Sequence, residues 1–505
     1  MSERFQGKVR APEFPAGLEW LNTERPISLQ ELRGKVVLLD FWTYCCINCQ
    51  HVLPQLKKLE ARFPNELAVI GVHSGKFKSE AETYNVRQAV MRHDIRHPVV
   101  NDRQYLLWRA FAVRAWPTIL ILDPDGYVVG GHSGEITDDA TQALGDLFED
   151  LIRTFAAKGK IDRTPLDLTL EKHKQPETLL SFPGKVLADE ASGRLFVSDT
   201  EHHRILSFHL HTGKLLAQYG EGEAGKVDGS RKRARFHSPQ GLSLRDDALF
   251  VADTDNHSVR KIALDSGVVT TLAGTGQQAS PLPKPGPGPE QRLNSPWDVL
   301  AVGETVYIAM AGAHQLWAVD LPTGQLLPFA GDGVEALSDG ARLTAHLAQP
   351  SGLATDGERL WFVDSETSSV RAVLLPTGRV REASGEAVKT YAGEGLFDFG
   401  DVDGSPAVAR LQHCLGITCA AGRVYVADTY NNKIKVLNPS VRTIHTLSGS
   451  GEPGLHDGAG DDASFWEPGG LSAAGDFLYV ADTNNHAIRK VDRRTGIVHS
   501  LQLGE

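Results

Sequence analysis

A short apolar motif that ends in an acidic residue recurs along the chain, and this repeat constrains the fold more than any other feature. Five copies consist of an apolar run followed by Asp and then Thr or Ser, while the copy at residues 306–310 ends in Met instead. The position of the acid falls at residues 199, 253, 310, 364, 428 and 482, which are 54 to 64 residues apart. A period of this length indicates six supersecondary units that stack on one another.

Each unit contains the pattern of four short strands. A small-residue pair such as Gly241-Leu242 opens the first strand, and the acid ends the second. A basic and apolar run such as Val259-Arg260-Lys261-Ile262 forms the third, and the fourth leads into a glycine-rich loop. Four strands per unit, repeated six times, predict an all-β six-bladed propeller.

The repeated acids, and the histidines that follow them, are candidate ligands, but their place in the repeat favours a structural role. A short acid after a strand can cap the next turn through hydrogen bonds to the backbone. His203, His257, His314 and His486 each fall four residues after the acid position. Because they recur at one position of the repeat, packing between blades is favoured over metal binding.

The first 160 residues have a different pattern, in which strands alternate with helices. Residues 36–41, apart from Asp40, and residues 67–72 are apolar runs typical of buried strands, and apolar residues recur at helical spacing over 52–59 between them. Further strands are expected at 97–100, 119–122 and 127–129, and helices near 78–93, 103–112 and 137–157. This alternation predicts an α/β sheet layered between helices.

Three of the five cysteines lie in one run, Cys45-Cys46-Ile47-Asn48-Cys49, where the first of these strands should give way to a helix. A thiol at a helix N-terminus lies next to free backbone N–H groups and the positive end of the helix dipole, which stabilise a thiolate. The Cys-x-x-Cys pair therefore indicates thiol–disulfide exchange. The alternatives are half of a zinc site whose other half is missing, copper or zinc bound by all three thiols, and an inactive relic.

The residues around these cysteines resemble the active-site segment of thioredoxins. Asp40-Phe41-Trp42 precedes Cys46-x-x-Cys49, and Pro54 follows five residues later. The run Ala115-Trp116-Pro117-Thr118 before an apolar strand resembles the cis-proline loop of that fold. The helix and strand at 78–100 resemble the insertion of the TlpA-like branch, and the Cys-Ile-Asn-Cys sequence is similar to thioredoxin-like domains of the DipZ type.

The resemblance implies a role for each of these residues. Cys46 would be the nucleophile, and Cys49, one helical turn further on, would be the resolving thiol. Asp40 would be the buried acid that relays a proton to or from Cys49, a task that suits a carboxyl group with a raised pKa. Trp42 would shield the cysteine pair.

The cis-proline loop and the departures from the thioredoxin pattern add further expectations. Pro117, in the cis form, would let the backbone of Trp116 pair with an extended substrate chain. Cys45 stands where thioredoxins usually carry Trp, and packing is favoured over catalysis for it. Ile47-Asn48 replaces the familiar Gly-Pro, so the direction of electron flow stays open. A Thr-x-x-Cys as in peroxiredoxins is present, but Leu39 stands where that motif requires Pro, which argues against a peroxidase.

The repeats in turn resemble NHL repeats, as in the run Asp482-Thr483-x-Asn485-His486-x-Ile488-Arg489-Lys490-Val491. A thioredoxin-like domain followed by six such blades is similar to the NHL-repeat-containing protein 2 family over nearly the whole chain. We therefore expect a multidomain protein, with an α/β thioredoxin-like domain at 1–160, a linker at 161–175 and an all-β six-bladed NHL propeller at 176–505.

Charge and hydropathy narrow the classes of partner. Residues 1–160 carry 20 basic and 20 acidic side chains, so all of the net charge of −11 lies after residue 160 and nucleic-acid binding is not expected. The basic run 231–235 is interpreted as a solvated loop, with a nucleic-acid or acidic-partner contact as the alternative. Residues 1–7 lack the apolar core of a secretory signal, and no apolar run reaches about 18 residues, so we expect a cytoplasmic protein without a membrane span.

Two functions from different classes remain open. The first is a thiol–disulfide oxidoreductase that uses Cys46 and Cys49 on a protein substrate recruited by the propeller. The second is a non-enzymatic scaffold or redox sensor whose propeller binds protein partners. No cofactor or metal is expected, and a propeller hydrolase or lyase lacks a catalytic constellation. The sequence does not indicate the substrate, the electron donor or the oligomeric state.

Overall fold

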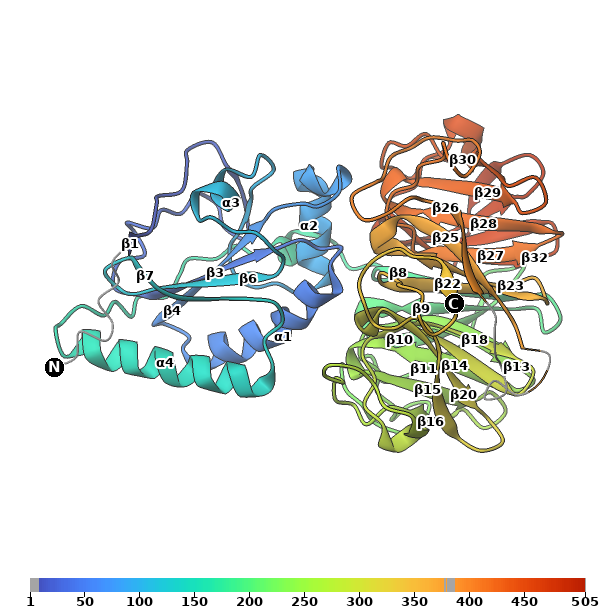
Figure 1. Ribbon diagram of the computed structural model, residues 1–505, viewed down its shortest axis with the longest axis horizontal. Coiled ribbons are helices and arrows are strands. Elements are labelled where there is room, and N and C mark those ends of the chain that lie inside the picture. Colours follow the sequence, from blue (N-terminus) through green and yellow to red (C-terminus); the bar gives the residue numbers. More distant parts are fainter. Residues whose placement is uncertain (1–8, 377, 379–386, 505) are drawn as a thin grey trace. The chain divides into compact units, whose positions relative to one another are not determined.

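A computed structural model of the chain describes residues 9–376, 378 and 387–504. It divides into two compact units, Met1–Glu177 and Thr178–Glu505. The first is α/β and the second is a six-bladed β-propeller, which confirms the predicted fold class (Figure 1). Among the helices of the described residues, none has both the length and the apolar character needed to cross a membrane.

The first unit is built on a seven-stranded sheet in the order β1-β7-β6-β3-β4-β5-β2. The strands are β1 (Val9–Arg10), β2 (Glu19–Leu21), β3 (Val36–Trp42), β4 (Leu67–His73), β5 (Val99–Asn101), β6 (Thr118–Leu122) and β7 (Tyr127–Ser133). β3, β4 and β5 run parallel, and the other pairs are antiparallel. Because β3 is central, all seven of its residues are buried, which accounts for an apolar run that only Asp40 interrupts.

The helices of the first unit are α1 (Ile47–Arg62), α2 (Thr83–Arg92), α3 (Leu106–Ala110) and α4 (Asp138–Ala156). α4 begins where predicted because the Thr137 side chain accepts a hydrogen bond from the Ala140 N–H at 3.2 Å and caps the helix. The helix expected near 78–93 is instead a short 3-10 turn, η2 (Ser79–Ala81), followed by α2. The expected helix is interrupted between η2 and α2 because the backbone of Glu82 is extended.

The segment 161–175 belongs to the first unit. The buried Lys35 Nζ donates to the carbonyl oxygens of Asp162 at 3.3 Å and Thr164 at 2.6 Å. In the 3-10 turn η3 (Glu171–Lys174), the Glu171 carboxylate accepts from Arg87 Nε at 2.9 Å. These contacts hold the expected linker against the α/β sheet and its helices.

Six antiparallel sheets form the blades of the second unit (Figure 1). The first blade contains β8 (Pro183–Asp189), β9 (Arg194–Asp199), β10 (Arg204–His209) and β11 (Leu215–Tyr219), and the second contains β12 (Gly229–Ser230), β13 (Pro239–Arg245), β14 (Ala248–Asp253), β15 (Ser258–Ala263) and β16 (Val268–Ala273). The third blade contains β17 (Gly286–Pro287), β18 (Pro296–Val302), β19 (Thr305–Met310), β20 (Gln315–Asp320) and β21 (Gln325–Ala330), and the fourth contains β22 (Gly340–Ala341), β23 (Pro350–Thr355), β24 (Arg359–Asp364), β25 (Ser369–Leu374) and β26 (Ala387–Ala392). The fifth blade contains β27 (Gly416–Ala420), β28 (Arg423–Asp428), β29 (Lys433–Asn438) and β30 (Thr443–Ser448), and the sixth contains β31 (Gly458–Ala459), β32 (Pro468–Ala474), β33 (Phe477–Asp482), β34 (Ala487–Asp492) and β35 (Ile497–Ser500). The acid position ends the second main strand of every blade, as the repeat predicts.

Each repeated acid is buried and bonded within its own blade. In the second blade, Asp253 accepts from the His237 N–H at 2.8 Å and from Arg260 Nη1 at 2.7 Å. The corresponding acid–base pairs, with the base seven residues after the acid, are Asp364–Arg371, Asp428–Lys435 and Asp482–Arg489. In the first blade the acid pairs with a base five residues on, as Asp199–Arg204. The third blade carries Met310 and Trp317 at the positions of Asp253 and Arg260, and both are buried. The acid and the base are thus replaced together.

The residue four positions after the acid joins each blade to the next. Its backbone has a positive φ, and its side chain accepts a hydrogen bond from a backbone N–H of the following blade. The six bonds are Ser238 N to His203 Nδ1, Ser295 N to His257 Nδ1, Gln349 N to His314 Nδ1, His413 N to Ser368 Oγ, Glu467 N to Asn432 Oδ1 and Phe182 N to His486 Nδ1. The last bond closes the ring between the sixth blade and the first. The histidines therefore do pack between blades.

A buried lysine crosses the centre of the ring. Lys185, on the innermost strand of the first blade, donates through Nζ to the carbonyl oxygens of Ser351 at 2.9 Å and of Leu415. The same atom lies 3.8 Å from Asp298 Oδ2, on the innermost strand of the third blade. Lys185 is 5% exposed, so its side chain fills space around the propeller axis.

Candidate redox site

Cys46 lies at the junction between β3 and α1. It is the N-cap residue of the helix, with an extended backbone, and its carbonyl oxygen accepts from the N–H groups of Cys49 at 3.0 Å and Gln50 at 3.1 Å. The side chain is partly exposed, unlike those of the other two cysteines of the run. A thiol at this place faces the end of the helix that stabilises negative charge.

Cys49 lies one turn into α1 and is fully buried. Burial raises the pKa of its thiol well above the usual range, and a hydrogen bond with the Cys46 side chain acts in the same direction. The structure therefore brings the two thiols together in the expected asymmetric arrangement, with one accessible and the other enclosed.

Asp40 projects from β3 into the same region. It is 0% exposed, and neither carboxylate oxygen has a hydrogen-bond partner among the described residues. Burial raises the pKa of Asp40 to about 7, while the charge of His97 lowers it and that of Glu60 raises it. The charge of Asp40 also contributes to the raised pKa of Cys49. The acid and the enclosed thiol are thus electrostatically linked.

Trp42, two residues after Asp40 on β3, is fully buried. Its ring meets the His73 ring edge to face, with centroids 5.1 Å apart. The Tyr44 ring stacks on the same His73 ring, with centroids 5.5 Å apart. Burial lowers the pKa of His73 to about 3. The sheet next to the dithiol is therefore lined by aromatic rings and a neutral imidazole.

The Trp116–Pro117 peptide bond is cis, as the resemblance to thioredoxins implies. Trp116 Nε1 donates to the Ser74 carbonyl oxygen at 2.9 Å, and its ring lies 4.5 Å from that of Trp108. Pro117 is buried directly before β6, the strand that pairs with β3. The loop is thereby tied to the same sheet that carries Asp40.

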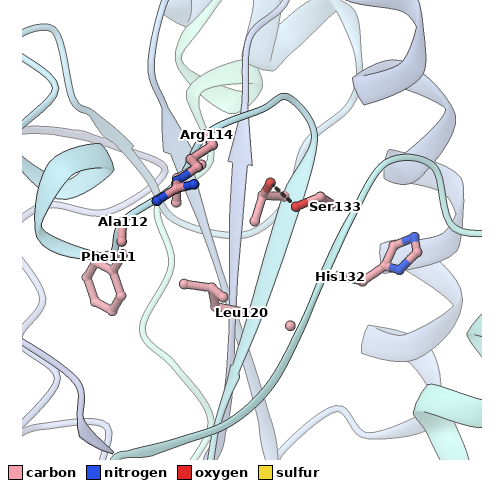
Figure 2. A pocket seen from close by; sticks show the side chains of 9 residues that line it. Phe111, Ala112, Arg114, Leu120, His132 and Ser133 are labelled. Atoms are coloured by element: carbon pink, nitrogen blue, oxygen red, sulfur yellow. Dashed lines mark hydrogen bonds between the residues drawn. The ribbon is translucent and has the colours of Figure 1, made fainter.

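A pocket of about 250 Å³ adjoins this loop, between β6, β7 and residues 111–114 (Figure 2). Its lining combines apolar Leu120 with polar Arg114, Thr118 and Ser133. The two hydroxyl oxygens of Thr118 and Ser133 lie 2.9 Å apart. The first unit therefore has a hollowed surface immediately next to the cis-proline residue.

Cys45 is buried, and its backbone is held by a residue that the sequence did not indicate. Its N–H donates to Glu80 Oε1 at 2.9 Å, and Glu80 Oε2 accepts from the N–H groups of Lys76 at 2.8 Å and Phe77 at 2.9 Å. Thr43 Oγ1 lies 3.8 Å from Cys45 Sγ. Glu80 thus fastens the loop between β3 and α1 to the one after β4.

His97 and Glu60 were also missed by sequence reasoning. One signal was present, because Gly71 interrupts an otherwise apolar strand, and glycine in a strand often marks a close approach of other groups.

Within the described residues, no group of three or more His, Cys, Asp or Glu side chains is placed to hold a metal ion. The basic run 231–235 is mostly exposed, with Arg235 paired to Glu221 and Glu223.

Comparisons with known proteins cover both units. Residues 34–128 match a family described as Thioredoxin-like. Protein SUPPRESSOR OF QUENCHING 1, chloroplastic, of Arabidopsis thaliana is 43% identical over 98% of this chain and 48% of its own length. NHL repeat-containing protein 2 of Bos taurus is 42% identical over 98% of this chain and 72% of its own length. Protein DipZ of Mycobacterium bovis is 35% identical over 35% of this chain and 26% of its own length.

The chain thus spans about half of the Arabidopsis relative and 72% of the bovine one. The bovine match includes both the α/β unit and the propeller, which are the two parts that the cysteine motif and the repeats point to. The chain belongs to the NHL repeat-containing protein 2 family.

Proposed function

We propose that the first unit is a thiol–disulfide oxidoreductase whose redox dithiol is Cys46 and Cys49. The observation that carries this proposal is the asymmetric pair at the start of α1, with Cys46 partly exposed and Cys49 buried beside it. Asp40, whose pKa of about 7 lies near physiological pH, supplies a group that can both accept and return a proton.

In the direction that reduces a substrate disulfide, the Cys46 thiolate attacks one substrate sulfur and forms a mixed disulfide. The first substrate thiolate leaves and takes a proton from solvent. Cys49 then gives its proton to Asp40 and attacks the Cys46 sulfur, and the second substrate thiolate leaves and is protonated by solvent. The pair ends as a disulfide and the substrate as two thiols, and oxidation of a substrate runs through the same steps in reverse.

The supporting residues act around this pair. The Trp116–Pro117 segment pairs with an extended segment of the substrate protein, next to the pocket that contains Arg114 and Thr118. Trp42 shields the buried side of the dithiol. Cys45 has a packing role, in keeping with its burial and with the anchoring of its N–H by Glu80.

The propeller serves as the platform that recruits protein substrates or partners in the cytoplasm. Lys185 fills space around the axis, so partners bind on the faces or rim of the ring rather than inside it. The excess of acidic residues after residue 160 supports protein partners over nucleic acid.

A redox titration of the full chain tests the dithiol. The protein is equilibrated in glutathione buffers, its thiols are alkylated, and its intact mass is measured. We expect one two-electron transition that is lost in Cys46→Ala and kept in Cys45→Ala, the matched control. If no transition occurs, or if it requires Cys45, the dithiol mechanism is wrong and a scaffold whose propeller binds protein partners replaces it.

A further inference from the structure

The face of the sheet that carries Asp40 also carries other buried polar groups that the dithiol steps do not use. Trp42 Nε1 and His97 Nε2 are buried and, like both oxygens of Asp40, have no hydrogen-bond partner among the described residues. A buried polar group without a partner is unfavourable by about 1–3 kcal/mol. Several such groups at one place point to a function.

Gly71 allows these groups to approach one another. It lies on β4 in register with Asp40 on β3. A Cβ atom at Gly71 would lie 3.1 Å from Trp42 Nε1 and 3.4 Å from His97 Nε2. The Gly71 N–H also donates to the Pro98 carbonyl oxygen at 2.9 Å, which holds the segment before β5 against β4. A side chain at Gly71 would therefore press on Trp42 and on Val99, whose Cγ2 would also lie 3.1 Å away, and would touch the His97 ring.

His97 connects this buried face with a partly exposed carboxylate. Its Nδ1 lies 3.2 Å from Glu60 Oε1, and the side chains of His97 and Glu60 are 5% and 27% exposed. Asn22 Nδ2 donates to the His97 carbonyl oxygen at 2.9 Å and fixes the backbone there. One nitrogen of the imidazole thus faces the interior, and the other contacts a carboxylate that reaches solvent.

The charges on these groups act on Asp40. The charge of His97 lowers the pKa of the Asp40 carboxyl, and that of Glu60 raises it, both against the larger effect of burial. The other titratable groups that face this region are Cys49 on α1, whose thiol pKa is raised, and His73 on β4, whose pKa of about 3 keeps it neutral. His97 and Glu60 are therefore the groups that link Asp40 to the surface.

We propose that His97 and Glu60 form a proton route between Asp40 and solvent. The proposal rests on the dithiol function proposed above. When Cys49 attacks the mixed disulfide, its thiol proton passes to the Asp40 carboxylate. Asp40 then gives a proton, through an intervening water molecule, to Nε2 of a His97 ring that carries its single proton on Nδ1. The imidazolium so formed gives the Nδ1 proton to Glu60, and Glu60 releases it to water. The reverse reaction returns a proton along the same groups, so no other reactant is needed.

The test follows one step in the full chain. Cys46 is first converted to a mixed disulfide with thionitrobenzoate, and attack by Cys49 then releases the coloured thiolate. We expect His97→Gln and Glu60→Gln, which keep polar side chains but cannot relay a proton, to lower the plateau rate of release, reached at a pH where Asp40 is ionised, by about tenfold or more. His173→Gln and Glu24→Gln alter exposed side chains and serve as matched controls with unchanged rates.

The pH profile of release separates a proton route from a structural effect. The rate rises as Asp40 ionises, so its midpoint reports the Asp40 pKa. Loss of His97 should move the midpoint upward and loss of Glu60 should move it downward, since the two charges act on Asp40 in opposite directions. These midpoint shifts follow from the charges alone, so the plateau rate tests the route: shifted midpoints with a wild-type plateau rate in both variants would overturn it.

Each outcome has a clear meaning. Normal release in both variants would overturn the route while leaving the dithiol function intact, whereas failure of wild-type Cys49 to release the thiolate would overturn the proposed function itself. Circular dichroism checks folding. Gly71→Ala is a second variant that keeps both titratable groups. Its Cβ would lie 3.1 Å from both Trp42 Nε1 and Val99 Cγ2, so these side chains must shift beside His97, and it should also slow release. Release at the wild-type rate in Gly71→Ala would contradict the route.

Discussion

Asp40 is a carboxyl group in the centre of a sheet, with neither oxygen hydrogen-bonded within the described part of the chain. Burial raises its pKa from an ordinary value of 3.8 to about 7. Between pH 3.8 and about pH 7, Asp40 holds a proton in the folded chain and has lost it in the unfolded chain. The free energy of unfolding therefore falls as pH rises through this window, because ionised Asp40 is disfavoured only in the folded state.

Asp40→Asn should remove this pH dependence. Relative to the wild type, the variant should gain unfolding free energy as pH rises from 4 to 8, by up to about 4 kcal/mol. Urea unfolding of the full reduced chain at several pH values measures the difference, in which the contribution of the propeller cancels. Asp139→Asn, at an exposed position of α4, is the control. Parallel stability curves for Asp40→Asn and wild type would contradict the raised pKa.

At the scale of the strands, every blade except the third is held by a buried acid that bridges two segments. Asp253 joins β14 to the third strand through Arg260 and to the preceding segment through the His237 N–H. Removing one partner of such a buried pair leaves a charge without compensation, while replacing both by apolar side chains is often tolerated. The third blade, with Met310 and Trp317, is a natural example of the double replacement.

A double-mutant cycle in the second blade should reproduce this relation. Asp253→Met alone should destabilise the propeller by about 3 kcal/mol or more. Combined with Arg260→Trp, it should cost less than the sum of the single changes, by at least about 1 kcal/mol. Urea unfolding of the four proteins measures the coupling. The exposed pair Asp255 and Lys261, changed in the same way, should be additive. Additivity at Asp253 and Arg260 would refute the interpretation.

For the propeller as a whole, six hydrogen bonds between blades form a closed cycle. Each uses the side chain four residues after the acid, and the bond from Phe182 N to His486 Nδ1 joins the last blade to the first across 304 residues of sequence. Burial lowers the pKa of His486 to about 4. Between pH 4 and pH 6.5, His486 binds a proton in the unfolded chain but not in the folded propeller. The unfolding free energy therefore falls as pH drops through this window.

His486→Asn should abolish this loss at low pH. Asn432 occupies the same position in the fifth blade and accepts the equivalent bond through Oδ1, and Asn tolerates the positive φ found there. Compared with wild type, the variant should become relatively more stable between pH 6.5 and 4, by up to about 2 kcal/mol after allowance for partial exposure. Thermal unfolding across this range measures the effect. His445→Asn, on an exposed strand face, is the control.

Much of this architecture could be read from local sequence. The repeat period predicts six blades because each blade is one supersecondary unit, and the main strands lie where the apolar runs place them. The Cys-x-x-Cys run predicts a dithiol at the start of a helix because the preceding strand is apolar on both faces except at Asp40. The short edge strands β1 and β2 and the packing of 161–175 were missed, since few local residues specify them and their partners lie far along the chain.

The sequence by itself determined the order of the two folds, the number of blades and the positions of Asp40, Cys46 and Cys49 at one strand–helix junction, because these follow from periodicity and short-range patterns. Only the tertiary structure decided what surrounds them. The approach of His97 to Asp40 across Gly71 depends on the order of parallel strands. The contact of Cys45 with Glu80 depends on two loops meeting. Contacts between residues distant in sequence arise when the sheet and the ring close, and no local pattern encodes them.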